Sequence, residues 1–239
     1  MSERRLESSA SALLHRSAVQ LLPLLLVALP WSGVRAADEP DPELVKAAVG
    51  APAVDVARDL CSARQVMKMA KFAEGMGGHV TVVVSGVEIT GKNVNQVRED
   101  TRRRIAAYEA AASQRGVTSV ASRYRATAEN CGNTGSFLAA AISEGLNDVV
   151  VTQQGPAVAL SFRGKAGGKK QTLDAEACLV ENRLAMIDPV ETGFSYLGEV
   201  TQGRFVIRPD VETLMSGMFP PSDRTRLEAC VIQLNPGDD

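Results

Sequence analysis

The spacing of apolar residues predicts two long helices in the first half of the chain. Between residues 53 and 76, apolar side chains recur at intervals of three and four, which places them on one face of a helix. A second such segment covers residues 94–114, with Asn93 and Gln96 expected to cap its start and Gly116 to stop it. The two inner faces consist of Val56, Leu60, Ala63, Met67 and Ala70, and of Val97, Thr101, Ile105, Tyr108 and Ala112.

Strand-like patterns follow each of these helices. Residues 79–90 are rich in β-branched side chains and predict a strand or hairpin. Beyond Gly116 the chain breaks into short runs of alternating apolar and polar residues, separated by glycine and proline. Such runs favour an antiparallel meander that closes into a barrel or a sandwich. They cover residues 148–153, 157–163, 171–180, 183–187, 194–200, 204–208 and 227–234.

These patterns together predict an α+β fold. An α-rich part, residues 37–116, is expected to pack on a C-terminal antiparallel β meander domain, residues 117–239, and the chain is long enough to bury a real core. The order of the strands resembles that of lipocalin-like barrels, but such a resemblance of layout implies no function.

Residues 1–36 have the features of a secretory signal peptide. Arginines precede an apolar run, residues 17–31, and the small residues Val34 and Ala36 stand before a cut at Ala37. The run contains two prolines and is shorter than the roughly 20 residues that span a bilayer. We therefore expect cleavage, no membrane span afterwards, and a protein located in the periplasm or secreted.

Charge and composition narrow the possible partners. The chain has 26 basic and 28 acidic side chains, and the leader takes away four arginines and two glutamates. An acidic remainder argues against nucleic-acid binding, which depends on lysine and arginine to neutralise phosphates. Arginine outnumbers lysine, which is typical of a GC-rich bacterial genome, so we place the protein in a bacterial envelope.

Four cysteines remain after the leader, and each is isolated in the sequence. An even number in an exported chain predicts two disulfides, and three pairings are possible. Sequential pairing, Cys61 with Cys131 and Cys178 with Cys230, is favoured here because it ties each half of the chain to itself. The isolated spacing argues against a cysteine metal site.

The stretch SGVEITGKN, residues 85–93, has the spacing of a phosphate-binding loop. It lacks the hydroxyl that would bind Mg²⁺, because Asn93 holds that position, and Glu88 would place a negative charge beside phosphate. We therefore interpret it as a turn within a β segment, followed by a turn into a helix. No nucleotide or other cofactor is expected.

Two further candidates have ordinary explanations. Met67, Met69, Met76 and His79 suggest soft-metal ligands, but Met67 and Met69 would face different sides of a helix, so no metal is expected. The basic run 102–104, with Arg98, is balanced by Glu99 with Arg103 and Asp100 with Arg104 at helical spacing. Arg98 and Arg102 are less compensated, which leaves an anion or partner contact open.

The sequence favours binding over catalysis, although an enzyme stays open. After removal of the leader, His79 is the only histidine that could belong to a catalytic triad. The sequence contains no G-x-S-x-G nucleophile motif, and nothing singles out one pair of carboxylates for catalysis. We expect an exported, non-catalytic binding protein whose partner is a small apolar ligand or an envelope protein. One alternative is an envelope accessory or assembly protein acting through a surface, and another is a metal-independent hydrolase. The residues expected to line a ligand cavity are Phe162, Phe194, Tyr196 and Phe205.

Overall fold

The computed structural model describes residues 40–77, 80–132, 134, 136–187, 195–212 and 224–237. All of these belong to one compact unit, Ala36–Asp239. The predicted signal peptide, residues 1–36, lies outside the described residues, and so do His79 and Phe194.

The two predicted long helices are confirmed. Asp41 caps a short helix before them by accepting a hydrogen bond from the backbone N–H of Glu43 at 3.0 Å. Gly116 ends the second of the two long helices with a φ of 87°, a conformation that glycine adopts at little cost. The three helices are α1 (Pro42–Gly50), α2 (Ala53–Gly75) and α3 (Val94–Arg115).

Asn93 is the N-cap residue of α3, as predicted, but its side chain makes no capping bond to the helix. Instead its Oδ1 accepts from the N–H of Thr90 at 2.7 Å, and its Nδ2 donates to the carbonyl of Glu88 at 2.9 Å. Asn93 therefore closes the turn that leads out of a hairpin, which consists of β1 (Val82–Val84) and β2 (Val87–Ile89). Local bonding of this kind competes with capping for asparagine side chains.

The predicted meander is confirmed as a closed antiparallel barrel of eight of the described strands. Consecutive strands pair along the chain, and β10 closes the barrel because it pairs with both β3 and β9. The strands are β3 (Arg123–Glu129), β4 (Asp148–Gln154), β5 (Ala157–Ala166), β6 (Lys169–Val180), β7 (Arg183–Ile187), β8 (Ser195–Thr201), β9 (Arg204–Pro209) and β10 (Val231–Pro236).

One predicted strand differs from the structure. The run 227–234 begins in helix α6 (Arg224–Ala229), and only its second part belongs to β10. Leu227 of this helix reaches the barrel interior, so its apolar character comes from core packing and not from a strand. A further short helix, α4 (Phe137–Ser143), follows β3 and also contributes apolar side chains to the interior.

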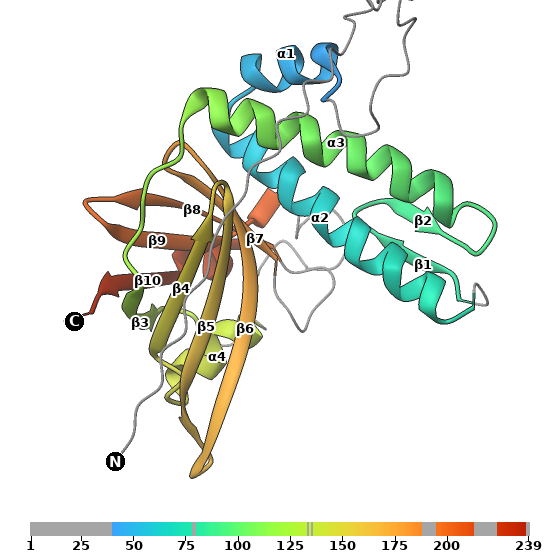
Figure 1. The fold of residues 1–239 in the computed structure, drawn as a ribbon. Helices are drawn as coiled ribbons and strands as arrows, with labels where there is room; N and C mark the ends of the chain where they lie inside the picture. The colour runs from blue at the N-terminus through green and yellow to red at the C-terminus, as the bar shows by residue number, and fades with distance from the viewer. Residues whose placement is uncertain are drawn as a thin grey trace, which may run out of the picture. The chain divides into compact units, whose positions relative to one another are not determined.

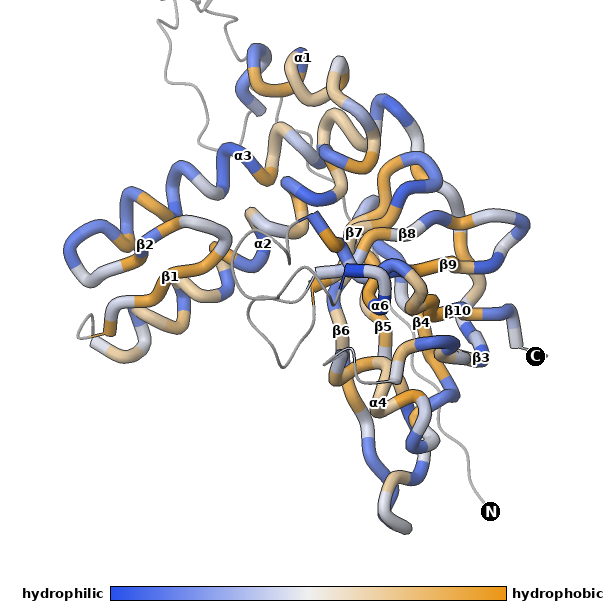
Figure 2. Tube along the Cα trace, turned by 180° about the vertical axis from the view of Figure 1, so that it is seen from behind, coloured by the Kyte–Doolittle hydropathy of each residue, from blue (hydrophilic) through white to orange (hydrophobic). Residues whose placement is uncertain are grey.

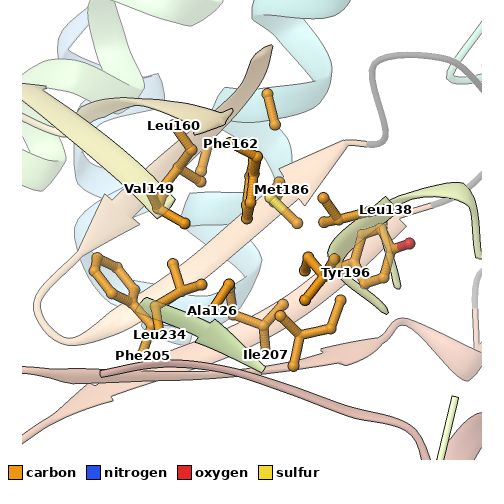
Figure 3. Packing of buried hydrophobic residues seen from close by; sticks show 14 of the residues in the cluster. Ala126, Leu138, Val149, Leu160, Phe162, Met186, Tyr196, Phe205, Ile207 and Leu234 are labelled. Atoms are coloured by element: carbon orange, nitrogen blue, oxygen red, sulfur yellow. The ribbon is translucent and has the colours of Figure 1, made fainter. Parts of the chain in front are cut away.

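Large side chains pack the inside of the barrel. Figure 3 shows Phe162, Met186 and Tyr196 from different strands lying close to Leu138 of α4. Tyr124 and Phe205 meet edge to face with their ring centroids 5.1 Å apart, an arrangement that adds to simple area burial. All of these side chains are at most 1% exposed, so they form the main hydrophobic core.

The helices pack against the outer surface of the barrel. The first half of α2 buries Val56 and Leu60 in a second cluster, which the outward-facing Cys178, Val180 and Ala185 of β6 and β7 complete. Figure 1 shows α3 beside α2, with the β1–β2 hairpin beside the end of α2. Three ion pairs reinforce the contact between helices and barrel: Arg58 with Asp210, Lys68 with Glu176, and Arg115 with Glu181.

The disulfide in the structure joins Cys131 to Cys230, so the favoured sequential pairing is wrong. Cys131 follows β3 directly and Cys230 precedes β10, and these two strands pair antiparallel with Glu129 opposite Val231. The bond therefore continues the pairing across the barrel's closing seam. The second predicted disulfide is not formed in this structure, in which Cys61 and Cys178 are buried thiols.

Candidate functional site

The residues predicted to line a ligand cavity lie inside the barrel. Phe162, Tyr196 and Phe205 belong to one cluster and are each 0% exposed, whereas Phe194 lies outside the described residues. The hydroxyl of Tyr196 shares a hydrogen bond with the hydroxyl of Ser136, the N-cap of α4. The structure brings these residues together, as expected, and it surrounds them with other core side chains.

A groove lies on the outside of the barrel, beneath α2. It has a volume of about 490 Å³, and its walls come from α2 on one side and from strands β4 to β7 on the other. Its lining residues are Cys61, Arg64, Gln65, Lys68, Met69, Thr152, Gln154, Ala157, Val158, Ala159, Asp174, Glu176, Ala177, Cys178 and Ile187.

An apolar strip on α2 continues this groove toward the hairpin. Phe72 and Met76 are each 52% exposed, which is unusual for side chains of this size. They stand three and seven residues after Met69, a lining residue of the groove, so all three share one side of the helix. We call Met69, Phe72 and Met76 the outer strip of α2.

The hairpin leaves most of the outer strip uncovered. Its apolar face, with Val84 and Ile89, packs against Val66, Ala70 and Ala73, and Met69 at the edge of the strip packs against the same cluster. Figure 2 shows the hydrophobic β1 lying beside this part of the helix. Phe72 and Met76 are left exposed.

Charged side chains border the groove, and most of them are paired. Lys68 reaches across to Glu176 at 3.2 Å, and Arg64 bonds Glu109 of α3. Burial lowers the pKa of Arg64, but the hydrogen bond to Glu109 and the electrostatic attraction of Cys178, Glu109 and Cys61 together raise the pKa above its ordinary value, so the guanidinium stays charged. Among the described residues, its buried Nε has no hydrogen-bond partner.

Two thiols stand at the inner end of the groove. Cys61 of α2 and Cys178 of β6 both line it, and Cys61 donates to the carbonyl of Ala185 at 3.2 Å. Burial raises the pKa of the Cys61 thiol well above its ordinary value, and the hydrogen bond to Cys178 raises it further. The Cys61 thiol is therefore largely protonated at neutral pH, which makes it a poor nucleophile.

A second hollow, of about 570 Å³, lies beside the start of α2 and strands β8 and β9. Its principal charges pair with each other, Arg115 with Glu181 and Arg183 with Glu199. It has no exposed large apolar side chain among its lining residues, so the groove with the outer strip is the stronger candidate.

The stretch SGVEITGKN forms a hairpin and a turn. Ser85 and Gly86, with φ values of 48° and 75°, make the turn between β1 and β2, and Glu88 pairs with Val83 inside the hairpin. Lys92 is exposed in the turn that follows. The predicted bend at Gly86 is confirmed, and the stretch has no loop that could cradle a phosphate.

The basic side chains of α3 are balanced, but partly by other partners than predicted. Arg98 bonds Glu74 at 2.6 Å and Arg102 bonds Glu99 at 2.8 Å, so neither is uncompensated. Glu99 also pairs with Arg103, as predicted, at 3.7 Å. Asp100 bonds Arg103 at 3.1 Å, three residues away, in place of the predicted Arg104.

Sequence reasoning missed Phe72, the central residue of the outer strip. The sequence contains a signal for it, which is a large aromatic residue outside the predicted inner face of the helix. Such a position is notable in a chain with few aromatic residues. Within the described part of the chain, no group of three or more His, Cys, Asp or Glu residues is arranged to hold a metal ion. The helices described here also include none with the length and apolar character needed to cross a bilayer.

Comparisons with family models, curated proteins and solved structures found no match to this chain.

Proposed function

We propose that this protein is an exported, non-catalytic binding protein of a bacterial envelope, which holds an apolar segment of another envelope protein along the outer strip of α2. The observation that carries this proposal is the exposure of Phe72 and Met76, each 52%, directly beside a groove of about 490 Å³. Exposed apolar surface next to a concave, partly polar lining is typical of interaction sites.

The chemistry of the groove suits a protein segment. Burying an exposed phenylalanine or methionine contributes about 1.5–3 kcal/mol each, and flexible methionine side chains adapt to different partners. Arg64 lines the groove, and its guanidinium adds hydrogen-bond donors for a backbone carbonyl or a side-chain oxygen. The other charges are paired, so we expect binding to depend weakly on salt.

A small apolar ligand inside the barrel is the second candidate function. Its support is the gathering of Phe162, Tyr196 and Phe205 in the interior. The complete burial of all three, and the contact of Phe205 with Tyr124, favour a solid core over a cavity. The surface is therefore the better-supported site.

Photo-crosslinking in the producing bacterium tests the proposal. A photoreactive residue at position 72 should give a discrete protein adduct, identified by mass spectrometry, and the same residue at position 83 should not. Val83 is a suitable control because it is 67% exposed and lies on the opposite face of the hairpin from α2.

Affinity for the identified partner then provides the quantitative test. Phe72→Ser should weaken binding about 10- to 100-fold, as expected for a central apolar contact. Phe137→Ser is the matched control, because Phe137 is also an exposed phenylalanine, at 44%, on a different helix. Equal adducts at positions 72 and 83, or equal affinities of the two serine variants, would contradict the proposal.

A further inference from the structure

Cys61 and Cys178 lie in contact although they are far apart in the sequence. The sulfur of Cys61 is 3.2 Å from the carbonyl oxygen of Ala185, and Ala185 is the cross-strand partner of Cys178. Both cysteines belong to the same apolar cluster, between α2 and the outer face of β6 and β7. Both cysteines also line the same end of the groove. A helix and a strand thus present two thiols to one another.

The other two cysteines leave only this pairing. Cys131 and Cys230 are already bonded to each other across the barrel seam. All four cysteines of the chain are described, so Cys61 and Cys178 are the two thiols that remain. A chain with an apparent export signal meets disulfide-bearing oxidants after export, and pairs of adjacent thiols are oxidised in such compartments.

We propose that Cys61 and Cys178 are a dithiol modification site, which a disulfide-bearing oxidant converts into a second disulfide that joins α2 covalently to β6. The inference rests on the contact between the two cysteines and on the export that the proposed function includes, and it does not depend on the binding role of the outer strip.

The reaction balances as two thiol–disulfide exchanges. The Cys61 thiolate attacks one sulfur of the oxidant, which forms a mixed disulfide and releases one thiolate of the oxidant. The Cys178 thiolate then displaces the second, so that the oxidant takes up two electrons and the two thiol protons. Both cysteines line the groove, and Cys61 is the entry point because it is 5% exposed, compared with 1% for Cys178.

Burial sets the pace of this reaction. The raised pKa of the Cys61 thiol keeps the thiolate fraction low at neutral pH, so oxidation is slow there and accelerates as the pH rises. The product closes a loop of more than a hundred residues between α2 and β6. A loop of that length should raise the melting temperature by on the order of 10 °C.

The test uses the mature protein with the Cys131–Cys230 bond intact. Oxidised glutathione is added, and the unreduced protein is digested and analysed by mass spectrometry. The expected result is a peptide pair joined through Cys61 and Cys178, a mass lower by two hydrogens, and the higher melting temperature. Purification of the protein with this bond already formed would support the proposal equally.

Serine variants provide the matched controls. Cys61→Ser and Cys178→Ser should each carry at most one glutathione adduct and show no comparable rise in melting temperature. The Cys131→Ser, Cys230→Ser double variant should still form the new bond, because it retains only this pair. Wild-type protein that ends as stable glutathione adducts, keeps two free thiols, or links Cys61 to a cysteine other than Cys178 would overturn the proposal.

Discussion

The hydroxyl of Tyr196 on β8 bonds the hydroxyl of Ser136, whose oxygen also accepts from the N–H of Ala139 at 3.0 Å. One serine therefore caps α4 and fixes a buried tyrosine. Because α4 contributes Leu138 and Ile142 to the barrel interior, this pair ties the barrel wall to the helix that packs into it.

Replacing Tyr196 distinguishes a solid core from a ligand cavity. Tyr196→Ala should lower the free energy of unfolding by about 3–5 kcal/mol, the usual cost of removing a large buried aromatic side chain. Tyr196→Phe, which removes only the hydroxyl, should cost about 1 kcal/mol. Urea denaturation measures both. A much smaller cost for the alanine variant, together with an apolar probe that binds wild-type protein and not the variant, would favour the small-ligand function.

Loss of the Cys131–Cys230 bond should destabilise the barrel strongly. The two cysteines are separated by 99 residues, so the bond removes much entropy from the unfolded chain. The Cys131→Ser, Cys230→Ser double variant should lose roughly 4–5 kcal/mol in the chain-entropy account. Chemical denaturation of the two proteins under identical conditions measures the difference. A loss below about 1 kcal/mol would mean that the seam is held by strand pairing alone.

The free thiol of Cys61 should make the free energy of unfolding fall as the pH rises in the alkaline range. Its pKa is raised in the folded protein, so its contribution is complete below the ordinary value of 9.0 and is lost as the pH rises toward the folded value. The free energy of unfolding should fall by up to about 1.4 kcal/mol per pH unit in this window.

Urea denaturation from pH 8 to about pH 10, without oxidant, measures this slope. Cys61→Ser is the control, because serine does not titrate there and its slope should be shallower. Tyr124 contributes in the same direction at still higher pH, because burial raises its pKa above the ordinary value of 10.0. Identical slopes for wild-type protein and variant would show that Cys61 is not responsible.

The turn lysine should be dispensable. Lys92 is exposed, so Lys92→Ala should change the free energy of unfolding by less than about 0.5 kcal/mol. Wild-type protein should also show no rise in melting temperature with ATP and Mg²⁺. Differential scanning fluorimetry tests both expectations. An ATP-dependent rise that disappears in Lys92→Ala would establish a nucleotide site in spite of the hairpin geometry.

Local periodicity explains why much of the fold was predictable. Side-chain spacing depends on backbone geometry, so α2, α3 and most barrel strands were recognised from their apolar patterns. The run 227–234 was predicted as one strand, but it contains the end of helix α6 and most of strand β10. Both segments pack on the same core, so both carry apolar residues and look alike in the sequence. Such short segments are decided by tertiary packing.

Long-range pairing explains what the sequence could not reveal. The disulfide depends on β10 lying beside β3, a contact between the first and last strands of the barrel that no local pattern records. The contact of Cys61 with Cys178 depends likewise on which strand α2 covers. The exposure of Phe72 and Met76 depends in the same way on how much of α2 the hairpin covers.

The position of β10 has a consequence for how the protein reaches its native state. A chain that is synthesised from its N-terminus produces β3 long before β10, so the barrel wall stays open until Val231–Pro236 have been made. During this interval β3 and β9 both present unpaired edges, which are templates for association between chains. Chaperones that shield strand edges should therefore matter more for the yield of this protein than for its final stability.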